Sequence, residues 1–100
     1  MSIEIPIDLL RRAVTREGVR AVYVFGSYAQ GNADRHSDLD VLIVHETERP
    51  FLERFRDFDA VFNLGPAVDL LVYTPEEFER MQKRGNPLVC EVLRTGKRIL

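Results

Sequence analysis

One segment limits the folds open to this 100-residue chain more than any other, the run DLDVLIV at positions 38–44. After Asp40, every residue in this run is apolar. A strand with one face in water alternates polar and apolar residues, whereas a strand covered on both faces is continuously apolar. We therefore expect residues 38–44 to form a central strand of a sheet with helices packed against it.

The surrounding patterns predict alternating strands and helices. Two further runs have the composition of strands, VRAVYVF at 19–25 and AVDLLVYT at 67–74, and KRIL at 97–100 suits an edge strand. Apolar residues at helical spacing predict helices at 6–18, 49–65, 74–85 and 86–96, and residues 27–31 suit one helical turn. Together these elements predict an α/β (α+β) fold, a small mixed β-sheet with helices packed against it, in a single domain at 1–100.

Some side chains are expected in the core on composition alone. The helix predicted at 49–65 carries an aromatic stripe, made of Phe51, Leu52, Phe55, Phe58 and Phe62. We expect this stripe to be core that packs on the sheet, and the alternative is a surface for a partner. Cys90 is expected to be a small buried residue, and His45 to lie in a loop or at the surface.

Composition also excludes several classes of protein. The net charge of −2 argues against a nucleic-acid binder that relies on a basic surface. Cys90 is the only cysteine, so a reducing compartment fits best. The N-terminal residues MSIEIPIDLL lack the features of a signal peptide, and no apolar run reaches the roughly 18 residues of a membrane span. We expect a cytoplasmic protein whose partners include neither nucleic acid nor a membrane.

The first candidate site residues are the two acids at the head of the central strand. In a strand, residues i and i+2 point to the same face, so Asp38 and Asp40 are expected side by side, with Cα atoms about 6.6 Å apart. Their like charges would repel each other unless a cation lies between them. Magnesium prefers oxygen ligands and commonly uses one or two carboxylates. Turn or capping chemistry is the alternative for Asp38, but it explains Asp40 poorly.

A third acid, Asp69, lies inside the apolar run at 67–74. An aspartate in such a strand is unfavourable unless it is paired or bound to metal. If this strand neighbours the one at 38–44, Asp69 joins the other two acids. Three carboxylates could then hold two magnesium ions about 3.5–4 Å apart, an arrangement suited to phosphoryl or nucleotidyl transfer.

Gly26 and Ser27 follow the first predicted strand directly. A glycine suits a point where the backbone bends or approaches a ligand, and Ser27 would open a helical turn whose backbone N–H groups can bind phosphate. Capping that turn is the structural alternative for Ser27, and it is compatible with phosphate binding. The chain contains neither a P-loop motif nor the dinucleotide-binding GxGxxG motif.

The stretch GSYAQGNADRHSDLD resembles the G-S-x10-D-x-D signature of the DNA polymerase beta-like nucleotidyltransferase superfamily. The likeness covers roughly residues 19–75 and includes Asp69 as the third carboxylate. It is closest to the minimal nucleotidyltransferase (MNT) domain proteins of bacteria and archaea. The resemblance implies a nucleotidyltransferase fold of the polymerase beta palm type. One position departs from the pattern, since Gln30 stands where many members carry arginine.

The resemblance also implies roles for individual residues. Asp38 and Asp40 would bind two Mg²⁺ ions. Asp69 would bind the catalytic ion and help deprotonate the acceptor hydroxyl. Gly26 and Ser27 would hold the triphosphate of ATP, the substrate.

Proteins of this type are often paired with a small helical HEPN-type protein, and some are antitoxins that transfer AMP to a tyrosine of that toxin. We therefore expect a Mg-dependent protein adenylyltransferase of a toxin–antitoxin system, which could form a homo-oligomer or a hetero-oligomer. A chain this short has little material for binding a small acceptor, so the acceptor should be a protein. Two alternatives stay open: a non-catalytic module that masks its partner, and a regulator that senses Mg-ATP.

Overall fold

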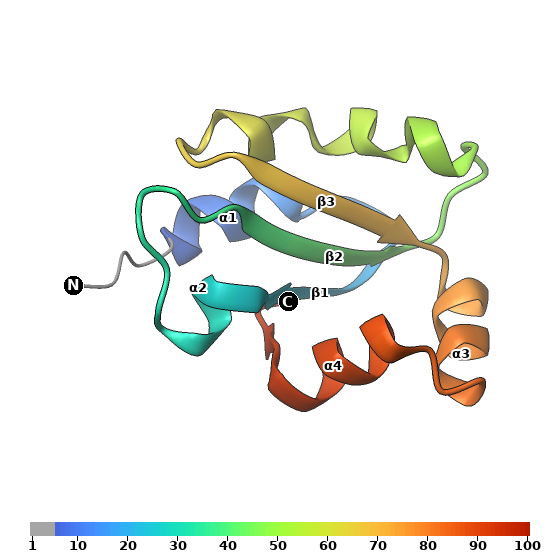
Figure 1. Ribbon diagram of the computed structural model, residues 1–100. Helices are drawn as coiled ribbons and strands as arrows, with labels where there is room; N and C mark the ends of the chain where they lie inside the picture. The colour runs from blue at the N-terminus through green and yellow to red at the C-terminus, as the bar shows by residue number, and fades with distance from the viewer. Residues whose placement is uncertain (1–5) are drawn as a thin grey trace.

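A computed structural model describes residues 6–100 (Figure 1). Along the chain its elements are α1 (Ile7–Val14), β1 (Val19–Phe25), α2 (Gly26–Gln30), β2 (Leu39–His45), the 3-10 helix η1 (Phe51–Asn63), β3 (Val68–Tyr73), α3 (Pro75–Lys83), α4 (Pro87–Thr95) and β4 (Lys97–Arg98). The prediction that the N-terminal segment is not a signal peptide concerned residues 1–10. Of these, residues 1–5 lie outside the described residues. None of the helices within residues 6–100 is long and apolar enough to cross a bilayer.

The four strands form one mixed sheet in the order β3-β2-β1-β4. Strand β2 runs parallel to β3 and antiparallel to β1, and β4 pairs with β1 at one edge. The predicted central strand is therefore β2, which is buried along nearly its whole length. The predictions of an α/β fold with a mixed sheet and of an edge strand near the C-terminus are confirmed.

Helices cover both faces of the sheet (Figure 1). On one face, Leu10 and Val14 of α1 and Phe58 and Val61 of η1 pack in a single core cluster with alternate residues of β1 and β2. On the other face, the side chains of Leu42, Val44 and Leu71 pack with residues of α3 and α4. Even-numbered residues of β2 and odd-numbered residues of β3 thus point toward α3 and α4.

The aromatic stripe of residues 51–62 is not core as predicted. Phe58 is buried, but Phe51, Phe55 and Phe62 are each more than 40% exposed and Leu52 is 81% exposed. The prediction assumed 3.6 residues per turn, whereas η1 is a 3-10 helix, with three residues per turn, and is interrupted at Phe58 by non-helical backbone angles. The face that points inward consequently carries Arg54, Phe58 and Val61.

Two other placements were also wrong. Cys90 is exposed on α4, where the inward positions are Val89 and Val92. His45 is 3% exposed, because it is the last residue of β2 and the chain turns only after it. The helix that begins at Pro75 agrees with prediction, since Thr74 and Glu77 form a capping box at its start.

Candidate functional site

Two of the predicted acids meet on neighbouring strands. Asp40 of β2 and Asp69 of β3 are register partners in the parallel ladder, and by alternation both point to the face covered by α3 and α4. Asp69 is therefore the acid nearest to Asp40 along the sheet. Partial burial, then the charge of Asp69 and its hydrogen bond, and then the charge of Asp38 raise the pKa of Asp40 above its ordinary value of 3.8.

Asp38 lies at the edge of this pair rather than within it. Strand β2 begins at Leu39, so Asp38 is the last residue of the preceding loop, and its side chain is exposed. Its charge still acts on Asp40. Across residues 6–100, no three His, Cys, Asp or Glu side chains are already grouped as a metal site. The structure therefore brings Asp40 and Asp69 together, and the inclusion of Asp38 in a three-carboxylate site stays a prediction.

Gly26 lies directly against Asp40. The last residue of β1, Phe25, pairs with Asp40, and Gly26 follows with a φ of +71°. A Cβ atom built on Gly26 would overlap Oδ2 of Asp40. Glycine is thus required here both for its backbone conformation and for the close approach to the carboxylate.

Ser27 is the second residue of the five-residue helix α2. The N-cap position belongs to Phe25, without a capping side-chain hydrogen bond, so capping does not account for Ser27. The helical turn predicted at 27–31 is thus displaced by one residue, and Gly31, in the left-handed conformation, caps its end. Gly26 therefore lies against the Asp40 carboxylate, and Ser27 follows it directly in the first turn of α2.

The donor set fits a divalent cation. Carboxylate oxygens are the ligands that Mg²⁺ prefers, and Asp40 and Asp69 supply them from two adjacent strands. Burial raises the pKa of Asp40 most, and repulsion by the neighbouring acids Asp69 and Asp38 adds to this effect. A bound cation would remove this repulsion.

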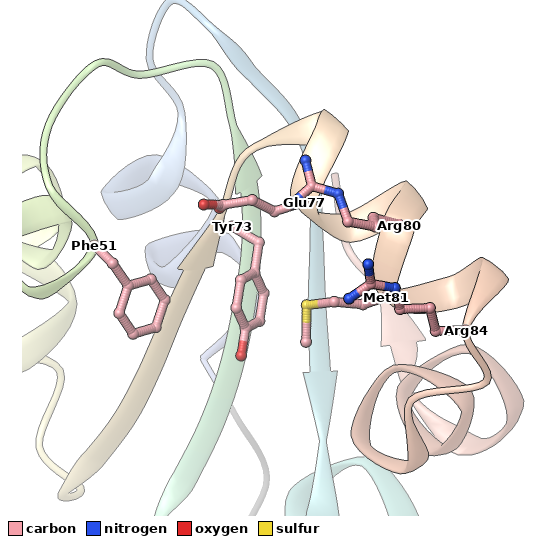
Figure 2. Close-up of a pocket in the computed structure, with 6 residues that line it drawn as sticks. All are labelled: Phe51, Tyr73, Glu77, Arg80, Met81 and Arg84. Carbon is pink, nitrogen blue, oxygen red and sulfur yellow. The ribbon is translucent and has the colours of Figure 1, made fainter.

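A pocket that the sequence did not reveal lies at the other end of β3. Phe51, Tyr73, Glu77, Arg80, Met81 and Arg84 line it. In Figure 2 the ring of Tyr73 stands between Phe51 and the side chains of α3. The only signal in the sequence was the aromatic stripe, for which a partner surface was the alternative to core.

A mixed sheet with helices on both faces, and with paired acids on the edge strand β3 and the neighbouring central strand β2, defines the class of nucleotidyltransferase-like α/β domains. The model of the nucleotidyltransferase domain family matches residues 7–89. The chain belongs to this family, and the predicted resemblance is confirmed.

Similar proteins agree with this assignment. The protein adenylyltransferase MntA of Thermococcus cleftensis is 42% identical over a match 59 positions long, which covers 57% of this chain. The match spans only 59% of the length of that curated relative.

Two solved structures share the fold. A toxin–antitoxin structure with AMP-PNP is 25% identical with a TM-score of 0.62, and the match covers 94% of this chain and 68% of that one. A structure of a tri-AMPylated HEPN toxin with its MNT antitoxin, from Shewanella oneidensis, is 21% identical with a TM-score of 0.53, covering 94% of this chain and 65% of that one.

Proposed function

We propose that this protein is a Mg-dependent nucleotidyltransferase that moves AMP from ATP to a hydroxyl group of a partner protein. The observation that carries the proposal is the Asp40–Asp69 pair, in register on parallel strands with the Gly26 backbone against Asp40. This pair would be unfavourable in a purely structural role, since burial and the neighbouring Asp69 both raise the pKa of Asp40 and two acids occupy paired positions of the sheet.

Asp40, Asp69 and Asp38 are the residues that would hold magnesium. When bound, magnesium would neutralise charge on the carboxylates and on the phosphates of ATP. The fit rests on the paired oxygen donors, and the exposed Asp38 is free to turn toward them from the loop before β2. We propose that two magnesium ions bind, as in the two-metal sites suited to phosphoryl or nucleotidyl transfer.

The other residues of the chain position the nucleotide. Gly26 and Ser27 would bind the β- and γ-phosphates through backbone N–H groups and the Ser27 hydroxyl, next to the carboxylates. Gln30 is the exposed last residue of α2 and does not carry the charge that arginine would bring at this position. The triphosphate would thus lie between α2 and the ends of β2 and β3.

In the proposed reaction, the acceptor oxygen forms a bond to the α-phosphorus of ATP. The bond from that phosphorus to the oxygen bridging to the β-phosphorus breaks, and pyrophosphate leaves with its electron pair. Asp69 accepts the proton of the acceptor hydroxyl and passes it to water. Asp69 suits this role because its side chain is exposed at the edge strand, where an acceptor can approach.

We further propose that the acceptor is a small helical toxin of the HEPN type and that this protein is its antitoxin, acting in the cytoplasm as one minimal nucleotidyltransferase domain. The name of the Thermococcus relative, a protein adenylyltransferase, supports AMP transfer to protein. The toxin–antitoxin structure with AMP-PNP supports both an ATP-like substrate and a toxin partner. A cytoplasmic location follows from ATP as substrate.

The test uses ATP labelled on the α-phosphate, with magnesium and a lysate of the source organism. Wild-type protein, Asp69→Asn and Asp59→Asn are compared. Asp59 is an exposed acid on η1, away from the site, so its replacement is a matched control. We expect label on one small protein with wild type and with Asp59→Asn, and none with Asp69→Asn.

Other outcomes separate the alternatives. If no protein is labelled but Mg-ATP binds in a calorimetric titration, the transferase proposal is wrong, and sensing or masking of the partner is favoured. Absence of Mg-ATP binding as well would reject the nucleotide site itself. If the partner is neutralised equally by wild type and Asp69→Asn, masking without transfer is indicated.

A further inference from the structure

Part of the lining of the pocket at the end of β3 is apolar. The rings of Phe51 and Tyr73 stack with centroids 5.5 Å apart, and Met81 completes the apolar lining. Its volume of about 400 Å³ is enough for one or two side chains of another protein. Methionine and aromatic rings suit an inserted apolar side chain, because they adapt to its shape and offer a large contact area.

The charge that the pocket presents is positive. Glu77 is already satisfied, because its carboxylate accepts hydrogen bonds from Arg54 at 2.6 Å and from the backbone N–H of Thr74 at 2.8 Å. In contrast, Arg80 and Arg84 take part in no salt bridge within the described residues. In Figure 2 both arginines extend from the α3 side of the pocket. A carboxylate on a ligand would find two unpaired guanidinium groups there.

The pocket and the carboxylate site lie along one face of one strand. Asp69 and Tyr73 are both in β3, four residues apart, and alternation places them on the same face. Four residues of a strand span about 13 Å. An acceptor held at the pocket could therefore reach the carboxylates with a few more of its own residues.

We propose that this pocket docks the acceptor protein through an acidic segment that inserts an apolar or aromatic side chain beside Phe51 and Tyr73. Carboxylates of the segment pair with Arg80 and Arg84, and the docked segment brings the acceptor hydroxyl toward Asp69. The inference rests on the function proposed above and names the chemistry by which the partner is recognised.

The test measures binding of a random copolymer of glutamate and tyrosine, by fluorescence anisotropy, with a lysine–tyrosine copolymer for comparison. The variant Arg80→Glu/Arg84→Glu is compared with Arg12→Glu/Lys83→Glu. The second variant has the same change in charge at exposed positions that do not line the pocket. We expect affinity for the acidic copolymer to fall at least about tenfold in the first variant and less than about twofold in the control.

A second matched pair of variants tests the apolar part of the pocket. Phe51 and Phe62 are both on η1 and are 42% and 43% exposed, but only Phe51 lines the pocket. We expect Phe51→Ser to weaken binding of the glutamate–tyrosine copolymer several-fold and Phe62→Ser to leave it unchanged. Equal losses within either matched pair, or equal binding of both copolymers by wild type, would overturn the proposal.

Copolymer binding by the Asp40→Asn variant tests this inference independently of the proposed function. Docking is supported if the Asp40→Asn variant still binds the acidic copolymer and the Arg80→Glu/Arg84→Glu variant does not. This conclusion holds even if no AMP transfer to any protein is ever detected. Conversely, AMP transfer to a lysate protein that is unchanged in Arg80→Glu/Arg84→Glu would leave the transferase intact and reject the docking pocket.

Discussion

At the scale of single residues, the contact between Gly26 and Asp40 is the most sensitive point of the site. Replacing Gly26 with alanine would add a Cβ that overlaps Oδ2 of Asp40, in a backbone conformation that alanine disfavours. We expect Gly26→Ala to displace the Asp40 carboxylate and to lower AMP transfer by more than about 100-fold. The strain itself should cost only about 1–2 kcal/mol of the free energy of unfolding, because the carboxylate is the end of a partly buried side chain and can rotate away.

Gly85→Ala is the matched control for this change. Gly85 has a φ of +70°, nearly that of Gly26, but no atom lies within 4 Å of the Cβ it would gain. We expect a similar loss of stability in urea denaturation with full transfer activity. If Gly85→Ala lost as much activity as Gly26→Ala, backbone strain and not the contact with Asp40 would be responsible.

Replacing Asp40 with asparagine should raise stability and abolish activity. Its pKa is raised, so the folded state holds this proton to higher pH than the unfolded chain does. Stability is therefore lost as the pH rises from 3.8 through the raised pKa, and the loss remains at neutral pH. Without magnesium, we expect Asp40→Asn to be more stable than wild type at pH 7, although transfer activity is lost.

Urea denaturation between pH 4 and pH 7 measures this effect, with Asp59→Asn as the control. The advantage of Asp40→Asn over wild type should grow as the pH rises across this range. A constant difference at every pH would mean that Asp40 is not a strained acid in the folded state. Acids that lower stability in this way are typical of functional sites.

At the scale of elements, strands were easier to predict than the segment 51–63. The strands were evident because β-branched and aliphatic residues gather in short runs, and β2 was assigned to the centre of the sheet because it is apolar on both faces. The period of η1 could not be read from its residues, since Phe51, Leu52, Phe55, Phe58 and Phe62 fit a regular α-helix equally well. Only the packing of Arg54 under α3 shows which face points inward.

The candidate site, like the fold, was predicted only in part. Alternation along a strand placed Asp40 on a definite face, and the apolar run at 67–74 marked Asp69 as unusual. Their pairing in register depended on β2 and β3 being parallel neighbours, which local patterns do not determine. The pocket at the end of β3 was not predicted, because Phe51, Tyr73 and Arg84 come from three segments that are separate in the sequence.

The ion pair between Arg54 and Glu77 connects η1 to the start of α3. Arg54 is 7% exposed, and its guanidinium also donates hydrogen bonds to the carbonyl oxygens of Arg49 and Val72. Glu77→Gln keeps a residue that can complete the capping box but removes the charge that faces Arg54. We expect this change to cost about 1.5–3 kcal/mol of the free energy of unfolding at pH 7.

Glu76→Gln controls for the loss of an acid in the first turn of α3, since Glu76 is exposed and its replacement leaves Arg54 paired. The hydrogen bond from Arg54 is the largest cause that lowers the pKa of Glu77 below its ordinary value of 4.5. The stabilisation is therefore complete above pH 4.5 and is lost as the pH falls through the lowered pKa. A difference between wild type and Glu77→Gln that persists at lower pH would contradict this account.

At the scale of the whole molecule, magnesium should stabilise the fold by relieving the repulsion between its acids. A ligand that binds only the folded chain adds about 1.4 kcal/mol to the free energy of unfolding at tenfold excess over its Kd. For a domain of this size, that corresponds to a rise in Tm of about 5–10 °C. We expect such a rise on adding MgCl₂ to wild type, relative to NaCl at equal ionic strength.

The same measurement on variants shows where the ion binds. Asp40→Asn should start from a higher Tm than wild type and gain little from magnesium, because it lacks both the repulsion and a ligand. Asp38→Asn tests whether the loop acid joins the site, since the structure places it beside the pair and not within it. A full magnesium response in Asp38→Asn would limit the site to Asp40 and Asp69, whereas a lost response would show that the loop closes on the cation. An equal response in all variants would mean that magnesium acts elsewhere on the molecule.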